Sequence, residues 1–190
     1  MKKLIALLLT AVMLMSCLAG CGAKPSGVTI SQLENEMLKQ LDDEGSFTVT
    51  SEGKGYAFTY TGSALHADLV INGVADKNEN IISVSATVSG ALNISYFKSM
   101  TYNQFMNDMN NMREVPMNRL AIEFLIFYFS YGAVLFSGDD SADNQLASMS
   151  MMLDARSGAQ VFGGWTYTVE AYEETGSSDA KVVITATFGE

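Results

Sequence analysis

The chain contains few of the residues that build metal centres and nucleophilic active sites. Its 190 residues include one histidine, His66, and two cysteines, Cys17 and Cys21. A structural zinc site needs about four cysteine or histidine ligands, so these three residues are too few. The sequence also lacks a Gly-x-Ser-x-Gly elbow, a His-Glu-x-x-His helix and a phosphate-binding glycine loop. We therefore expect no catalytic residue, no cofactor and no metal ion, and the sequence favours a non-enzymatic protein.

Basic residues are also scarce. Eleven lysines and arginines stand against 21 acids, which gives a formal net charge of −10 at pH 7. Nucleic-acid binding depends on lysine and arginine contacts to phosphates, so we expect no nucleic-acid partner. Anionic lipid headgroups would repel the same acidic body.

The amino-terminal segment has the pattern of a secretory signal. Lys2 and Lys3 precede an uncharged apolar run over residues 4–15. A membrane-spanning helix needs about 20 apolar residues, and glycines follow this run closely. The segment is therefore expected to be a signal peptide and not a span.

The sequence "LAGC" at residues 18–21 follows this apolar run. It resembles the lipobox of bacterial lipoproteins, and the resemblance covers about the first 22 residues. It implies that Cys21 carries a lipid on its sulfur and that a peptidase cuts before Cys21. "LMSC", ending at Cys17, is a poorer match because Met15 is bulky where the family has a small or branched residue. A disulfide between cysteines four residues apart would close a very small loop and stabilise little.

This resemblance predicts the organisation and location of the protein. Residues 1–20 are the expected signal peptide, residues 21–28 a lipidated tether, and residues 29–190 one extracytoplasmic domain. The partners are then the cell membrane, reached through palmitate-type acyl chains on Cys21, and an unidentified protein or small-molecule ligand. Acyl chains contribute roughly 0.8 kcal/mol per buried methylene, and two or three chains hold a protein firmly.

The first half of the domain alternates like a β-meander. Thr29 with Gln32, or Ser31 with Glu34, fits a capping box that starts a helix, and Gly45 is expected to end it. Alternating apolar residues then predict four antiparallel strands near residues 47–50, 56–60, 65–71 and 82–88, with "ALNISYF" (91–97) extending the last. Asn72-Gly73 and "DKNEN" (76–80) are competing turn signals, and the sequence does not decide between them.

The second half is predicted to contain helices followed by two strands. Thr101 and Gln104 fit a second capping box, and Pro116 separates this helix from an apolar run over 120–136. Asp139, Asp140 and Asp143 suit the start of a third helix, and Arg156 suits its end. Strands follow near residues 165–169 and 182–188. We thus expect an α+β fold in which an antiparallel sheet of about six strands packs against helices.

Three patterns allow a functional alternative to a structural role. The 120–136 run, with Glu123 as its one charge, is either a membrane span or a helix buried under the sheet. Its 17 residues are slightly short for a span, and a span would put Trp165 and the last strands across the membrane from the other strands, so a buried helix is favoured. Met106, Met109 and Met112 recur every three residues and are expected to share one face of a helix. Their soft thioethers suit Cu(I), but methionine is also an adaptable core filler. Residues 138–144, "GDDSADN", lack the glycine of a calcium-binding EF-hand loop.

The remaining candidates are weaker still. His66 is the single histidine and lies within a strand pattern. Trp165 is expected in the core and not in a sugar-stacking site. The leading hypothesis is a non-enzymatic, lipid-anchored binding module on the extracytoplasmic face of the cell membrane. A small envelope hydrolase is the alternative, and a Cu(I) binder through Met106, Met109 and Met112 is less favoured.

Overall fold

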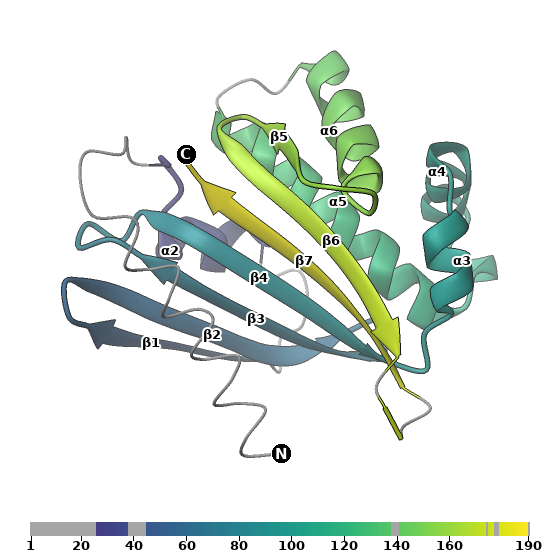
Figure 1. The fold of residues 1–190 in the computed structure, drawn as a ribbon, viewed down its shortest axis with the longest axis horizontal. Coiled ribbons are helices and arrows are strands. Elements are labelled where there is room, and N and C mark those ends of the chain that lie inside the picture. Colours follow the sequence, from purple (N-terminus) through teal and green to yellow (C-terminus); the bar gives the residue numbers. More distant parts are fainter. Residues whose placement is uncertain (1–25, 38–44, 138–140, 174, 177–178, 190) are drawn as a thin grey trace.

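A single antiparallel sheet organises the described part of the chain (Figure 1). The computed structural model describes residues 26–37, 45–137, 141–173, 175–176 and 179–189. The strand order is β1-β2-β3-β4-β7-β6-β5. The α+β class is confirmed, but the sheet has seven strands and not six. The missed strand, β5 (Gln160–Phe162), has three residues, which is too short to show an alternating pattern.

The first four strands form the predicted meander. They are β1 (Ser46–Glu52), β2 (Gly55–Ala64), β3 (Ala67–Ala75) and β4 (Ile81–Gly90). The competing turn signals are resolved in favour of 76–80, because β3 runs through Asn72 and Gly73. Gly73 is needed there for space: a Cβ at this position would lie 2.1 Å from the ring of Phe58. The Asp76 carboxylate accepts hydrogen bonds from the backbone N–H groups of Asn78 and Asn80 and so closes the turn.

The expected extension of the fourth strand is wrong. Residues within 91–97 begin a helix, α3 (Ile94–Ser99), because the Asn93 side chain accepts a hydrogen bond from the Tyr96 N–H at 2.8 Å. Ile94 and Phe97 are buried on this helix. A run of only seven residues fits both the helical period of 3.6 residues and the strand period of two, so the capping residue is the deciding signal.

The other helices complete one layer on one face of the sheet, behind the strands in Figure 1. α4 (Tyr102–Asn110) begins with the predicted Thr101–Gln104 capping box. Pro116 directly precedes α5 (Met117–Ser137). Ser141 caps α6 (Ala142–Asp154), and Asp143 lies in its first turn, as predicted. β6 (Trp165–Glu173) and β7 (Ala180–Phe188) then return to the sheet, where β7 lies between β4 and β6.

The core lies between this helix layer and the facing side of the sheet. Ile184 and Val182 of β7, Ala86 of β4 and Leu125 and Ile126 of α5 are all 0% exposed. The expectation that the 120–136 run covers the sheet as a buried helix therefore holds for its inward face. Within the described residues, no helix is long and apolar enough to cross a membrane.

The amino-terminal helix is attached to the start of β4. The predicted capping box at Thr29 and Gln32 begins α2 (Ile30–Gln32), which a π-helical turn over Leu33–Met37 continues. The Ile81 N–H donates to the Val28 carbonyl at 2.8 Å. Val28 and Ser26 are already buried, so packing begins within the range expected to be tether.

Candidate functional site

A cluster of ionisable side chains lies where α3, α4 and α5 meet. The Asn93 cap fixes where α3 begins and so the direction in which Tyr96 points. The Thr101 cap does the same for Asp108 on α4. Arg119 and Glu123 are one turn apart on α5. These four residues, Tyr96, Asp108, Arg119 and Glu123, form the buried ionic cluster. The cluster links the side chains of α3, α4 and α5, three helices that are joined along the chain by short segments.

Arg119 is at the centre of the buried ionic cluster. Its guanidinium donates to Asp108, to the Tyr96 hydroxyl and, at 3.3 Å, to Glu123 Oε1. It also lies 3.5 Å from the centroid of the Tyr96 ring, in a cation–π arrangement. The Tyr96 hydroxyl is 2.7 Å from Asp108 Oδ2 and 3.2 Å from Glu123 Oε1, so its single proton serves one carboxylate at a time.

Glu123 is the least satisfied member of the buried ionic cluster. Its side chain is 0% exposed, and Oε2 has no hydrogen-bond partner among the described residues. Burial raises the pKa of Glu123 to about 7, although Tyr96 and Arg119 both act to lower it. Burial and the neighbouring Glu123 carboxylate raise the pKa of Tyr96 to about 12. The cluster can therefore take up or release a proton near neutral pH.

The geometry of the buried ionic cluster differs from that of a hydrolase cleft. Asp108 is 5% exposed and Glu123 is 0% exposed, while Arg119 at 28% is the most open of the three charged side chains. Both carboxylates are engaged by the same guanidinium. A substrate would have to displace Arg119 or Tyr96 to reach either one, so the arrangement fits a structural link between helices.

Arg156 provides a second link between helices. Its guanidinium donates to the carbonyls of Phe97 and Met100, at the end of α3, at 2.5 and 2.8 Å. It also bonds the Leu153 carbonyl of α6 at 2.6 Å. Arg156 was predicted to end the third helix, and it lies just after α6, where it also satisfies the carboxyl end of α3. Burial lowers its pKa.

The outer face of the sheet, opposite the helix layer, is polar. One cross-strand row runs over six adjacent strands, and we call it the polar row: Thr48, Thr59, Asn72, Ser85, Thr185 and Thr168. Hydrogen bonds join Thr59 to Asn72 at 3.0 Å and Thr185 to Ser85 at 3.4 Å. Its side chains are exposed or partly exposed. Neighbouring strands of a sheet are about 4.8 Å apart, so the polar row presents evenly spaced hydrogen-bonding groups.

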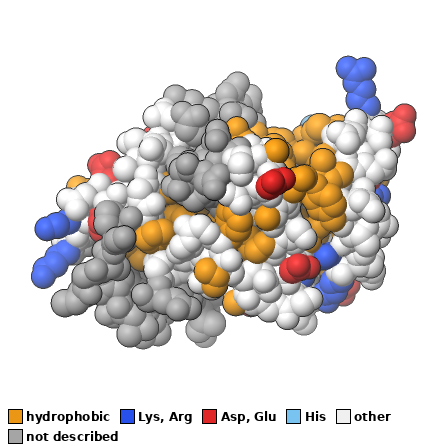
Figure 2. Space-filling model, turned by 90° about the horizontal axis from the view of Figure 1, so that it is seen from above, with side chains coloured by type: hydrophobic (Ala, Val, Ile, Leu, Met, Phe, Trp, Pro, Cys, Tyr) orange, Lys and Arg blue, Asp and Glu red, His pale blue; other side chains and the backbone are white. Residues whose placement is uncertain are grey.

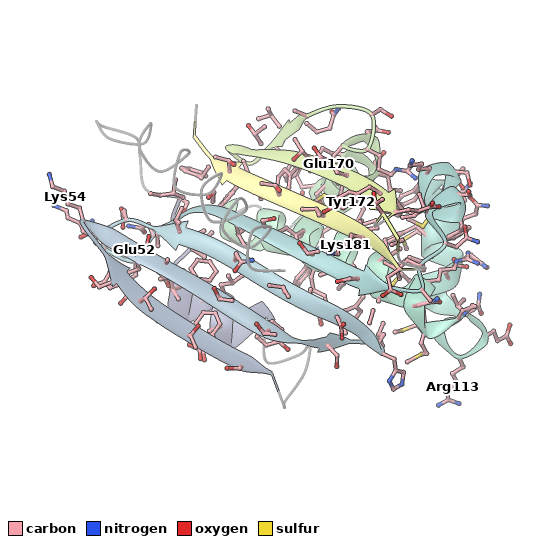
Figure 3. All side chains as sticks on the ribbon, turned by 60° about the horizontal axis from the view of Figure 1, so that its bottom comes forward. Glu52, Lys54, Arg113, Glu170, Tyr172 and Lys181 are labelled. Atoms are coloured by element: carbon pink, nitrogen blue, oxygen red, sulfur yellow. The ribbon has the colours of Figure 1, made fainter. Side chains whose placement is uncertain are left out.

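Charges on the outer face lie beside and beyond the polar row: Glu170 follows Thr168 by two residues on the same side of β6. In Figure 3, Glu170, Tyr172 and Lys181 are found together on β6 and β7, and Glu52 and Lys54 lie at the far end of the sheet. Tyr172 pairs with Lys181 across the strands and is 45% exposed. The outer face thus combines a neutral hydroxyl-rich centre with charged and aromatic margins.

The methionine pattern is divided by the structure. Met106 and Met109 lie on α4 and pack against the core, whereas α4 ends at Asn110. Met112 follows in a 3₁₀ turn and is 37% exposed. The expectation that all three share one helical face is therefore wrong for Met112, because the helix does not reach it.

The other predicted residues are not brought together. His66 is exposed in the turn between β2 and β3 with φ +65°, not within a strand. Trp165 is 5% exposed, which confirms its place in the core. Among the described residues, no three His, Cys, Asp or Glu side chains form a metal-binding group. Cys17, Cys21, Asp139 and Asp140 lie outside the described residues.

The sequence reasoning missed the buried ionic cluster. Glu123 was recognised only as the single charge of an apolar run, and Arg119 one turn before it was not connected to it. An isolated acid in a buried helix, with an arginine at i−4, is a signal for an internal ion pair. Tyr96 and Asp108 gave no such signal, because their approach depends on how α3 and α4 pack.

Comparison of the chain with protein-family models, with curated proteins and with solved structures finds no match.

Proposed function

We propose that this protein is a lipid-anchored, non-enzymatic binding module on the extracytoplasmic face of a bacterial cell membrane. The lipobox-like "LAGC" behind a basic and apolar segment carries the anchoring part of the proposal, with Cys21 as the lipidated residue. The acidic body supports it, because such a surface needs an acyl anchor to stay at an anionic membrane.

The binding part of the proposal is supported by the open outer face of the sheet. The carboxylates that converge in the described structure are buried and ion-paired, so they favour structure over hydrolysis. The polar row instead offers neutral donors and acceptors across six strands. We therefore propose that the partner is neutral and hydrogen-bonding where it meets this row.

The anchor is tested by substitution of each cysteine in the full chain. Cys21→Ser should move the protein from the membrane fraction to the medium or leave an uncut precursor, whereas Cys17→Ser should change neither. Mass spectrometry should find a diacylglyceryl thioether on Cys21 at the mature amino terminus. An unmodified thiol at Cys21 in the mature protein would contradict the proposal.

The binding surface is tested by a photocrosslinking amino acid at Thr168 in living cells. A discrete adduct is expected, and Thr185→Lys beside the probe should abolish it. The same probe at the exposed Asn78, in the turn before β4, is the control and should give no such adduct. Equal adducts from both positions, or none from Thr168, would reject the polar row as the binding surface.

A small envelope hydrolase is the second candidate, because a glutamate with a raised pKa beside an aspartate is typical of acid–base sites. Catalysis would require access to Glu123. Carbodiimide labelling of the folded protein, read by mass spectrometry, should modify the exposed Glu170 and spare Glu123. Rapid modification of Glu123 would favour the hydrolase.

A further inference from the structure

The solvent side of α5 carries an aromatic stripe. Phe124 and Phe127 are partly buried and Tyr131 is 37% exposed. The rings of Phe127 and Tyr131 stack at 5.7 Å with an interplanar angle of 9°. No charged residue occurs from Phe124 to Gly132. The outward side of a helix is normally polar, so an apolar stripe indicates contact with something else.

Leu146 is a further exposed apolar residue, on the neighbouring helix. It is 50% exposed on α6, which packs against α5. α6 and the carboxyl end of α5 lie uppermost in Figure 1, and the view from above in Figure 2 shows hydrophobic side chains gathered on this side of the molecule. We call Phe124, Phe127 and Tyr131 on α5 the apolar face.

The path of α5 places the carboxyl end of the helix near the start of the described chain. Asn118, near the start of α5, bonds the Ala91 carbonyl, just beyond the end of β4. The 21 residues of α5 span about 31 Å, close to the length of β4, so the helix runs back along the sheet. It ends toward Ile81, the residue to which Val28 is bonded. Figure 1 shows the described chain beginning at this same end.

The tether is short. Five peptide steps separate Cys21 from Ser26, the first described residue, and they reach at most about 18 Å. A lipid on Cys21 would hold this end of the molecule close to the bilayer, and the apolar face extends from this end.

We propose that the apolar face of α5 rests on the lipid headgroup region and fixes the orientation of the protein on the membrane. This inference rests on the proposed anchor at Cys21. Tyrosine and other aromatic rings favour the membrane–water interface, and the lack of charge along the stripe lets it approach lipid. A second copy fits the face less well, because removal of Lys2 and Lys3 with the signal peptide leaves 9 basic residues against 21 acids, and two bodies of formal net charge −12 would be brought together.

The test uses the full lipidated chain in phosphatidylcholine vesicles. Since Cys21 is acylated and Cys17 is removed, Tyr131→Cys supplies a single thiol for a nitroxide label. Thr185→Cys on the outer face is the matched control. Collision with oxygen and with a water-soluble nickel chelate then reports the depth of each label. We expect the label at 131 to be shielded from nickel at least about threefold relative to the label at 185.

The outcomes distinguish failure of the apolar-face proposal from failure of the proposed anchor at Cys21. Flotation with vesicles that is lost in Cys21→Ser supports the anchor, and equal nickel access at both labels then overturns the apolar face alone. Absence of flotation in the wild type overturns the anchor itself. Dipolar broadening between labels at 131 would show a second copy on the face and would also overturn the inference. Hydrogen exchange of the unsubstituted protein should show vesicle-dependent protection over 124–131, which avoids any folding defect of the labelled variants.

Discussion

At the scale of single residues, burial changes the pKa of Glu123 in a way that its position in the sequence does not predict. The carboxyl loses hydration, and the Arg119 guanidinium that approaches it is shared with Asp108. The result is a pKa of about 7. A buried group of this kind makes folding depend on pH in a range where exposed carboxylates no longer titrate.

Glu123→Gln tests this dependence. A carboxyl whose pKa is higher in the folded state binds its proton more tightly when folded. The contribution of the Glu123 carboxyl to the unfolding free energy is therefore largest below the unfolded pKa of 4.5, and it is lost as pH rises to about 7. The wild type should lose on the order of 3 kcal/mol of unfolding free energy across this window, because a tenfold difference in proton affinity between the two states is equivalent to about 1.4 kcal/mol. The Gln variant should lack this loss.

The measurement is urea unfolding at pH 5, 6, 7 and 8, followed by circular dichroism. Glu170→Gln on the exposed side of β6 is the matched control and should keep the wild-type pH dependence. An unchanged slope in Glu123→Gln would mean that the carboxyl ionises normally inside the fold.

At the scale of elements, α5 has two different sides although its sequence is apolar almost throughout. Ile126 faces the sheet and is 0% exposed, whereas Tyr131 faces outward. Phe127, near the middle of the run, is partly buried and stacks on Tyr131, so it is not the most sensitive core position.

Two aspartate substitutions separate these sides. Ile126→Asp should destabilise the fold by about 3–5 kcal/mol, because it buries an unpaired charge. Tyr131→Asp removes an exposed ring and its stacking with Phe127, so it should cost only about 1 kcal/mol. Urea unfolding of a lipid-free chain measures both. Similar losses for the two variants would contradict the described orientation of α5.

The methionines of α4 give a second prediction at this scale. Met109→Ala should cost less than the ~2–5 kcal/mol expected for a fully buried methionine such as Met152, because Met109 is only partly buried. Met109→Leu should cost less than about 1.5 kcal/mol. Titration with Cu(I) under reducing conditions should show no saturable site tighter than about micromolar. Tight binding that Met109→Leu abolishes would restore the soft-metal hypothesis.

At the scale of the whole molecule, the amino-terminal residues close one end of the core. Val28 and Ile30 are each 4% exposed, and both belong to the same core cluster as the sheet. The boundary between tether and domain therefore lies before Val28.

Two truncations locate this boundary. A chain beginning at Ala23 should be monomeric and folded without detergent, because it keeps Val28 and Ile30 and loses only the anchor. A chain beginning at Ser31 exposes the surface that these two residues cover and should lose about 2–5 kcal/mol. Light scattering and thermal unfolding compare the two. Equal stability would place the boundary later than the structure does.

The sequence by itself determined the elements whose signals are local. Alternation fixed β1 to β4, β6 and β7, the Thr101 cap fixed the start of α4, and Pro116 fixed the start of α5, because each depends on neighbours within a few residues. The sequence left the cap of α2 open between Thr29 and Ser31, and the structure has Thr29. Cys21 and its lipobox also remain predictions of the sequence alone. Local signals failed where two were in competition, as at Asn72-Gly73, or where an element was too short to show a period, as in β5 and α3.

Only the tertiary structure decided which distant residues meet. Tyr96, Asp108 and the Arg119–Glu123 pair come from three helices whose packing angles are set by the core. The i,i+4 spacing predicts the pair within α5, but no spacing along the chain predicts its contact with Tyr96 and Asp108. The polar row likewise requires the register of six strands, including the insertion of β7 between β4 and β6. The outward direction of Phe124 and Tyr131 on α5 depends on which side of an almost uniformly apolar helix meets the sheet. Apolar composition favours burial of such a helix but does not determine which of its sides packs against the sheet. Contacts with residues far along the chain determine that side.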